Sequence, residues 1–210
     1  MDSRGLVTDR ERFLSLSSEC DRVVDTTKRL PDCVFRQAFT HYYAIEYMYV
    51  FREEFGTFLS QMAHVVQDKT VHYMALDPSP EEFYRQSGVY GAISLDSSNL
   101  AQRYVTVMNP RQGTSQILAG ANVGAFWGSS LRWAIVADRI SWELAIIGVP
   151  DDVDVGKISD FRCLNAAAVE EYIESQYRAV NPTGSIAADF TRRFSTNYPV
   201  DRWDDTDRLL

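Results

Sequence analysis

Three charged residues lie close together in one apolar stretch of the sequence, and their types could support ligand binding or acid–base chemistry. Asp138 and Arg139 separate two runs rich in Trp, Ile, Val and Leu, and Glu143 lies early in the second run. Carboxylates beside a guanidinium group can hold a polar ligand or shift each other's pKa. Asp is also common in turns, where its side chain serves only the backbone. We favour this structural role for Asp138, and the three residues are the candidate ligand-binding site.

A second group of carboxylates follows the same stretch. Asp151, Asp152 and Asp154 lie in the segment DDVDVGKISD, residues 151–160. Three Asp residues at this spacing could bind Ca²⁺, but the segment lacks the distal Glu of an EF-hand loop. We therefore expect an exposed acidic linker. Because acidic surfaces attract basic partners, these three residues are the candidate partner-binding site.

The sequence carries none of the common signatures of nucleotide-binding, hydrolase or zinc-protease sites, which are GxGxxG, GxxxxGK[ST], GxSxG and HExxH. Its three Cys residues form no CxxC pair, and His41, His64 and His72 lack the spacing of metal ligands. We expect no metal, no cofactor and no disulfide. His72 lies in an apolar run, and a histidine in such a run is most often a hydrogen-bonded core residue. With Tyr73, it could otherwise contribute to a pocket near Asp138.

The apolar stretch at residues 126–150 predicts a β-hairpin at the centre of a sheet. If residues 139–140 form a two-residue turn, Asp138 faces Ser141. The pairs on one face are then Ala137 with Trp142, Ile135 with Leu144, and Trp133 with Ile146. The turn lacks the Asn-Gly or Asp-Gly of the tightest hairpins, and a three-residue loop would exchange the faces, so the register stays open. We expect Trp133 and Trp142 to be largely buried on the two strands.

Apolar runs bounded by turn residues predict the strands of a central, mostly antiparallel sheet. We place these strands near residues 71–76, 90–95, 104–108, 131–137 and 142–149. Helical periodicity predicts helices at 9–28, 52–67, 79–88 and 166–179, and a last helix that begins near Thr183. Ser79 and Glu82 are expected to form a capping box at the start of the third helix, and Asn165 is expected to cap the fourth. Residues 34–50 suit either a strand or a broken helix. The order of elements indicates an α+β fold in which N-terminal and C-terminal helices cover the sheet.

Composition narrows the possible functions. The net charge of −8 and the absence of a basic run argue against nucleic-acid binding. The charged N-terminus and the lack of a long apolar segment argue against a signal peptide or a membrane span, so we expect a cytoplasmic protein.

One domain is expected to span residues 1–200, because the sequence shows no repeat and no break in composition. The acidic tail 201–210 is expected to fray, with Trp203 as its anchor.

A small acidic protein without a catalytic signature is typical of proteins that bind other macromolecules. We therefore expect a non-catalytic binding protein of the immunity-protein or adaptor type, whose acidic surface suits a basic protein partner. The alternative is a small-molecule-binding protein or a hydrolase-like enzyme with a polar site near the hairpin tip, residues 138–143. A deep pocket that gathers those side chains would favour the enzyme, and a shallow acidic and aromatic face would favour the binding protein.

Overall fold

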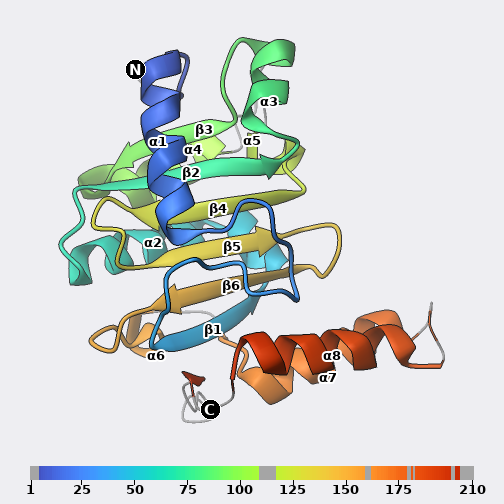
Figure 1. The fold of residues 1–210 in the computed structure, drawn as a ribbon. Coiled ribbons are helices and arrows are strands. Elements are labelled where there is room, and N and C mark those ends of the chain that lie inside the picture. The colour runs from blue at the N-terminus through green and yellow to red at the C-terminus, as the bar shows by residue number, and fades with distance from the viewer. Residues whose placement is uncertain are drawn as a thin grey trace.

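The computed structural model describes residues 5–108, 117–158, 162–178, 181, 183–199 and 202–203. These residues form an α+β fold built on a six-stranded antiparallel sheet with the strand order β1-β6-β5-β4-β2-β3 (Figure 1). The strands are β1 (His41–Glu46), β2 (Thr70–Asp77), β3 (Ala92–Asp96), β4 (Val123–Gly128), β5 (Ala134–Asp138) and β6 (Leu144–Val149). β5 and β4 lie at the centre, and every residue of both is buried.

Other segments of the chain pair with both edge strands of the sheet. Leu6 forms a bridge with Ile93 of β3, and Val7 donates its backbone N–H to Ala92. At the other edge, Ala44 of β1 exchanges two backbone hydrogen bonds with Leu164. Unpaired sheet edges favour aggregation, so this pairing protects the sheet against edge-to-edge association.

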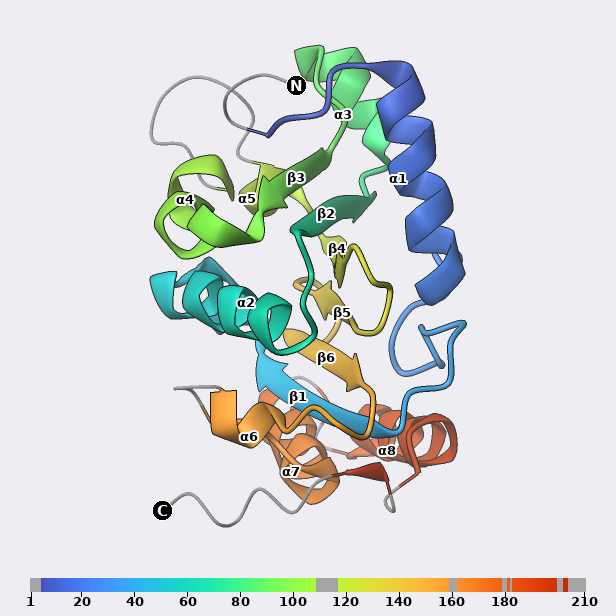
Figure 2. The same cartoon turned by 90° about the vertical axis from the view of Figure 1, so that its left-hand side faces the viewer.

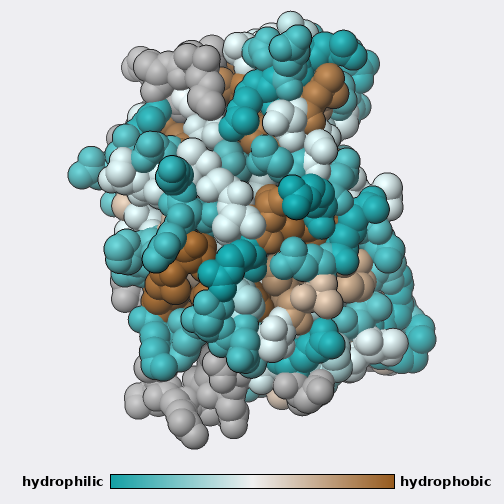
Figure 3. Space-filling view, turned by 60° about the vertical axis from the view of Figure 1, so that its left-hand side comes forward, coloured by the Kyte–Doolittle hydropathy of each residue, from teal (hydrophilic) through white to brown (hydrophobic). Residues whose placement is uncertain are grey.

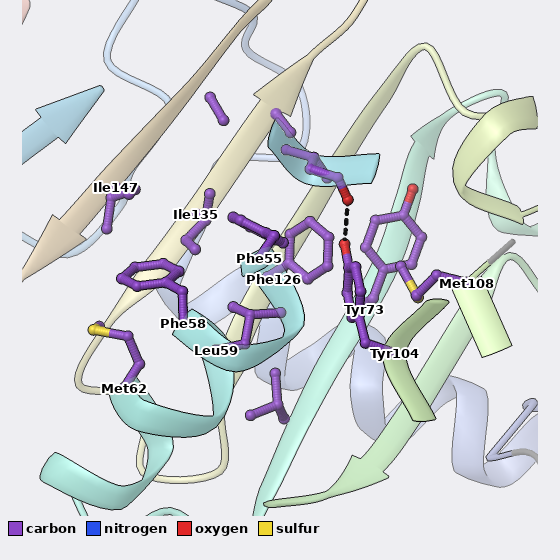
Figure 4. Packing of buried hydrophobic residues seen from close by; sticks show 14 of the residues in the cluster. Phe55, Phe58, Leu59, Met62, Tyr73, Tyr104, Met108, Phe126, Ile135 and Ile147 are labelled. Atoms are coloured by element: carbon purple, nitrogen blue, oxygen red, sulfur yellow. Dashed lines mark hydrogen bonds between the residues drawn. The ribbon is translucent and has the colours of Figure 1, made fainter. Parts of the chain in front are cut away.

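One face of the sheet packs against α2 (Glu53–Val65) and α4 (Leu100–Met108), with the short helices η1 (Tyr47–Phe51), η2 (Ser97–Asn99), α5 (Ile117–Gly120) and α6 (Val155–Ile158) nearby (Figure 2). Phe55, Phe58 and Leu59 of α2 are buried on this face, together with Phe126 and Ile135 of the sheet (Figure 4). The Phe55 and Phe126 rings meet edge to face at 5.3 Å. Burial of these aromatic side chains is a main source of stability for this layer.

A glycine sets the close approach of α2 to α4. A Cβ at Gly56 would lie 2.5 Å from the Cβ of Tyr104, so a larger residue would force the two helices apart. The buried Tyr104 hydroxyl donates a hydrogen bond of 2.7 Å to the carbonyl of Val50, drawn as the dashed line in Figure 4. This bond satisfies a polar group that would otherwise be costly to bury, and it ties α4 to η1.

The opposite face of the sheet packs against α1 (Arg10–Val23), α7 (Ala166–Tyr177) and α8 (Ser185–Asn197). Figure 2 shows α1 on the side of the sheet away from α2, while α7 and α8 lie near β1. The remaining helix, α3 (Pro80–Ser87), connects β2 to β3 in the chain. It begins with the capping box predicted at Ser79 and Glu82. Asn165 caps α7 as predicted, and Asp9 caps α1.

The α+β class predicted from the sequence is confirmed, as are four of the predicted strands. The predictions near 71–76, 90–95, 131–137 and 142–149 correspond to β2, β3, β5 and β6, and the ambiguous residues 34–50 contain β1 and most of η1. The central strand β4 was not predicted. Gly124 and Gly128 interrupt its apolar pattern, although both are buried in the sheet. A Cβ at Gly124 would lie 2.5 Å from the Tyr73 hydroxyl oxygen, which explains the small residue there.

The strand predicted at 104–108 is wrong, because these residues form the C-terminal half of α4. Leu100, Tyr104 and Val107 are spaced for one face of a helix, and all three are buried against the α2 layer. A short apolar run cannot be assigned to helix or strand from periodicity alone, and here packing against α2 decides the conformation.

The two-residue turn considered for the hairpin, and the pairing that would follow from it, do not occur in the structure. The structure pairs Asp138 with Leu144 and Ala137 with Ala145, so the loop spans residues 139–143 instead of two residues. Trp133 is fully buried, as expected, but it lies just before β5 rather than on the strand. Trp142 lies in the loop rather than on a strand and is partly buried, and its indole Nε1 donates to the Leu30 carbonyl at 2.8 Å.

Two predicted boundaries also differ from the structure. The first helix ends at Val23 instead of residue 28, because Val24 pairs with Phe35 in an isolated bridge. The last helix begins after a cap at Gly184 instead of at Thr183. Of the tail 201–210, the structure describes only 202–203, and Trp203 is 9% exposed, as expected for an anchor. The rest of the tail lies outside the described residues.

A buried carboxylate joins α2 to the centre of the sheet. Asp68 follows α2 and is 5% exposed. Its Oδ2 accepts a hydrogen bond from Trp133 Nε1 at 2.8 Å, and its Oδ1 accepts bonds from Ser130 N at 2.5 Å and Ser129 Oγ at 3.1 Å. Gly128 leaves room for it, because a Cβ there would lie 1.8 Å from Asp68 Oδ2. Asp68 therefore fixes the turn between β4 and β5.

Asp68→Ala is expected to lower the free energy of unfolding by about 2–4 kcal/mol, since it leaves the Trp133 indole N–H buried without an acceptor and removes the bond that holds Ser130 N in the β4–β5 turn. Urea denaturation followed by tryptophan fluorescence measures this loss. Asp96→Ala is the matched control, because Asp96 also accepts a backbone N–H, from Ser98, but at the exposed end of β3. The control should lose clearly less stability. Equal losses would contradict a central role for Asp68.

Candidate functional site

Asp138, the first of the polar residues selected from the sequence, ends β5 and is 1% exposed. Its Oδ1 accepts a hydrogen bond from Ser141 N at 2.8 Å, whereas its Oδ2 has no partner within the part of the chain that the structure describes. Burial raises the pKa of Asp138, and hydrogen bonds from loop N–H groups act in the opposite direction. Asp138 thus holds the β5–β6 loop from inside the fold.

Arg139 is bonded to the segment that precedes β4. Its guanidinium donates to the carbonyl of Ala119 and, at 3.3 Å, to Asn122 Oδ1. Asn122 in turn donates to Asp77 Oδ2 at 3.0 Å. Arg139 therefore connects the β5–β6 loop to the start of β4 and the end of β2, and its hydrogen bonds serve the fold.

Glu143 presents its carboxylate at the surface from a strained backbone position. Its φ of 53° lies in the left-handed region, which is uncommon for a residue other than Gly. Its carbonyl accepts hydrogen bonds from Tyr47 N at 2.7 Å and from the Tyr172 hydroxyl at 3.3 Å. These contacts from η1 and α7 hold the end of the loop in place.

Apolar and acidic side chains share the surface around this loop. Ile140 is 63% exposed and Met48 is 59% exposed, the highest values among the large hydrophobic residues that the structure describes. The exposed residue Glu46 ends β1 directly before η1. We call the surface formed by Glu46, Met48, Ile140, Glu143 and Tyr172 the hairpin-tip face. Its segments are joined by the hydrogen bond between Tyr47 N and the Glu143 carbonyl.

Two negative charges of the hairpin-tip face lie near one phenol. Burial, and then the charges of Glu143 and Glu46, raise the pKa of Tyr172 to about 12. Over the described ranges, no Lys, Arg or His nitrogen lies within 4.0 Å of either carboxylate. The hairpin-tip face is therefore acidic and partly aromatic, and it exposes two apolar side chains.

The aspartates at 151–154 lie between β6 and α6, away from the loop in sequence. Each pairs with a basic side chain: Asp151 with His41 at 3.0 Å, Asp152 with Arg132 at 2.5 Å, and Asp154 with Lys157 at 2.8 Å. The segment is less exposed than expected, because Val153 and Val155 are buried. Asp151 and Asp152 themselves are exposed.

His72 belongs to a polar cluster beneath α1. It is 2% exposed, and its Nε2 lies 3.2 Å from Thr70 Oγ1 and 3.7 Å from Glu19 Oε2. Its ring packs against Trp127 at 5.5 Å. Burial and the nearby charge of Arg12 lower the pKa of His72 to about 4. His72 is therefore a neutral core histidine at pH 7, on the face of the sheet opposite to Tyr73.

Comparisons with protein-family models, with curated proteins and with solved structures find no match to this chain. Among the described residues, no three His, Cys, Asp or Glu side chains are grouped closely enough to hold a metal ion. No described helix has the length and hydropathy needed to cross a bilayer.

Sequence reasoning missed most of the hairpin-tip face. It selected Glu143, but Glu46, Met48 and Tyr172 come from three other elements that meet only in the folded chain. Ile140 was assigned to the turn without a role. No local pattern marks these residues, because an exposed Met or Ile looks like any other apolar residue in the sequence.

The buried His72 predicts a loss of stability at acid pH. An ordinary histidine has a pKa of 6.5, so the unfolded chain binds more protons than the folded chain between about pH 6.5 and pH 4. The free energy of unfolding should therefore fall as pH falls through this window, by about 3 kcal/mol at 1.36 kcal/mol per pKa unit. Urea denaturation at pH 7, 5.5 and 4 measures the effect.

His72→Asn should remove this part of the pH dependence, whereas His41→Asn, at a more exposed histidine, should keep it. A His72→Asn protein whose stability changes with pH as the wild type does would show that the buried imidazole is not the group that titrates.

Proposed function

We propose that this protein binds another protein through the hairpin-tip face, in the manner of a non-catalytic immunity or adaptor protein. The observation that best supports the proposal is the exposure of Ile140 and Met48, at 63% and 59%, three residues before Glu143 and two residues after Glu46 in the chain. Interfaces often combine apolar anchors with a charged rim, and charge complementarity sets the choice of partner. The proposed partner is therefore basic and covers these apolar side chains.

The loop that carries Ile140 is already ordered by its contacts. Besides the bonds at Glu143, the Tyr177 hydroxyl donates to the Ser141 carbonyl, and the Trp142 indole is packed against Phe190 at 4.4 Å. A loop held in this way loses little conformational entropy on binding, which favours affinity. The acidic segment at Asp151, Asp152 and Asp154 is a second, peripheral part of the proposed interaction.

We also propose a cytoplasmic location. None of Cys20, Cys33 and Cys163 forms a disulfide bond. Reduced cysteines are usual in a reducing compartment, where disulfides are rare.

A small-molecule site or a hydrolase-like site near residues 138–143 is the second candidate. The observation in its favour is the unpartnered Oδ2 of the buried Asp138, whose pKa is raised by burial. Against it, Asp138 Oδ1 and the Arg139 guanidinium are bonded within the fold. A turnover activity of the purified protein that Asp138→Asn abolishes would favour this second function.

Ile140→Asp is expected to weaken partner binding by tenfold or more, since a central apolar anchor typically contributes above about 1.4 kcal/mol. A partner would first be captured from the native lysate, and its affinity for wild type and variants then measured by surface plasmon resonance. Leu14→Asp is the matched control, because Leu14 is 49% exposed on α1, outside the hairpin-tip face. A partner that binds all three proteins equally would contradict the proposed face.

Charge removal at the face should slow association. The double variant Glu46→Gln/Glu143→Gln is expected to have a lower on-rate than the wild type at low salt. At about 0.5 M salt, where screening is nearly complete, the on-rate of the wild type should fall to the level of the variant. Neutralising Asp151, Asp152 and Asp154 together should slow association less, because Arg132 and Lys157 already balance two of those three charges. An on-rate that responds to neither salt nor the Glu double variant would exclude electrostatic steering.

A further inference from the structure

A groove opens beside the C-terminal end of α2, where α6 and the η2 turn approach it. Its volume is about 910 Å³, and its accessible lining includes Gln61, His64, Val65, Gln67, Lys157 and Ile158. Figure 3 shows the side of the molecule on which α2 ends and β2 begins, and hydrophobic residues reach this surface as separate spots among hydrophilic ones. We call this cavity the α2–α6 groove. Its size falls within the range of small-molecule sites.

The floor of the groove is fixed by hydrogen bonds. Asp68 N donates to the Ala63 carbonyl at 2.7 Å, and Ser97 Oγ donates to the Asp68 carbonyl at 2.8 Å. Ser60 Oγ donates to the Ser97 carbonyl at 3.4 Å and so joins α2 to the η2 turn. The wall formed by α2 and the η2 turn is thus held in one arrangement, as a preformed site requires.

The described lining of the α2–α6 groove is less acidic than the chain as a whole, which has a net charge of −8. Among the described residues that line the groove, Asp68 is the one carboxylate, and both of its oxygens already accept hydrogen bonds from the β4–β5 turn and Trp133. The accessible ionisable side chains in this part of the lining are those of His64 and Lys157. Lys157 also pairs with Asp154 at 2.8 Å, but that pair is exposed and contributes little, so an incoming anion can compete for the ammonium group.

Gln67 follows the end of α2 beside the groove. Its φ of 60° is the left-handed conformation of a helix C-terminal cap: Gln67 N donates to the His64 carbonyl at 3.2 Å, and Asp68 N donates to the Ala63 carbonyl at 2.7 Å. The Gln67 side chain is exposed and makes no hydrogen bond to the described residues. Its amide lines the groove, where it can bond to a bound molecule.

The geometry points to a binding site for a small organic anion in the α2–α6 groove. The apolar body of the ligand lies against Val65 and Ile158, and its carboxylate or phosphate group faces Lys157 and His64 while accepting a hydrogen bond from Gln67. The site is separate from the hairpin-tip face, and it does not depend on the protein-binding function proposed above.

Benzoate and phenyl phosphate are suitable probes, because each joins an apolar ring to one of the two anionic groups, and benzyl alcohol is the neutral control. The chain has only three histidines, so the ring C–H signals of His64 can be followed by NMR during titration. Benzoate, phenyl phosphate or both should shift the His64 signals saturably, while the signals of His41 stay in place. The anion that binds more tightly identifies the group that the site prefers.

Lys157→Gln is expected to weaken the binding of the preferred anion by about tenfold, the loss typical of a charge-assisted hydrogen bond. Gln67→Gly should weaken it by about fivefold through loss of one neutral hydrogen bond, without lowering the thermal midpoint, because Gly suits the left-handed backbone. Lys69→Gln is the matched control, since Lys69 is exposed next to Asp68 but lies outside the groove lining, and this variant should bind as the wild type does.

Three results would overturn the proposal. Benzyl alcohol that binds as tightly as both anions would show that no anionic group is recognised. Equal affinities for the wild type, Lys157→Gln and Gln67→Gly would place the ligand outside the groove. Shifts of His41 as large as those of His64, or no saturable shift at all, would leave only nonspecific attraction to the surface.

Discussion

The buried carboxylate of Asp68 is the interaction on which the rest of this fold depends. It accepts a hydrogen bond from Trp133 next to β5 and two from the turn after β4, while its backbone N–H closes the end of α2. Burying a carboxylate is costly unless it is fully hydrogen-bonded, and these contacts meet that requirement. The same contacts explain why Gly128 ends β4, since any side chain there would occupy the position of the carboxylate. One residue thus sets the position of α2, of the β4–β5 turn and of the wall of the α2–α6 groove.

A second buried aspartate acts at the other end of β5. Asp68 binds the backbone of Ser130 before this strand, and Asp138 binds the backbone of Ser141 after it. Both ends of the central strand are therefore fixed by a carboxylate that replaces water as the acceptor of loop N–H groups. The two proposed binding surfaces follow from this arrangement. The α2–α6 groove lies near the first end and the hairpin-tip face lies at the second, so a ligand in one does not cover the other.

The sequence predicts well what is decided locally. The capping box at Ser79 and the cap at Asn165 each depend on residues within one helical turn, and both were placed correctly. The hairpin register was not predictable, because Glu143 adopts a left-handed φ that a Glu residue does not signal and that is held by Tyr47 and Tyr172 from distant elements. The helix at 104–108 likewise depends on the glycine contact between α2 and α4. The candidate site was found only at Asp138, Arg139 and Glu143, since spatial neighbours far apart in sequence leave no local pattern.

The exposure of Met48 and Ile140 is informative because the fold does not require an apolar side chain at either position. Tyr47 and Val50, one residue before and two residues after Met48, are buried, so η1 places its apolar side chains in the core wherever its geometry permits. Met48 and Ile140 are instead exposed to water, on the same two segments of the chain as Glu46 and Glu143, although a polar side chain at either position would cost the fold no core contact. The adjacent charges oppose self-association of the apolar side chains and attract a basic surface. A surface that repels its own copies and presents apolar side chains on a rigid loop has the properties expected of a site for a different, positively charged protein.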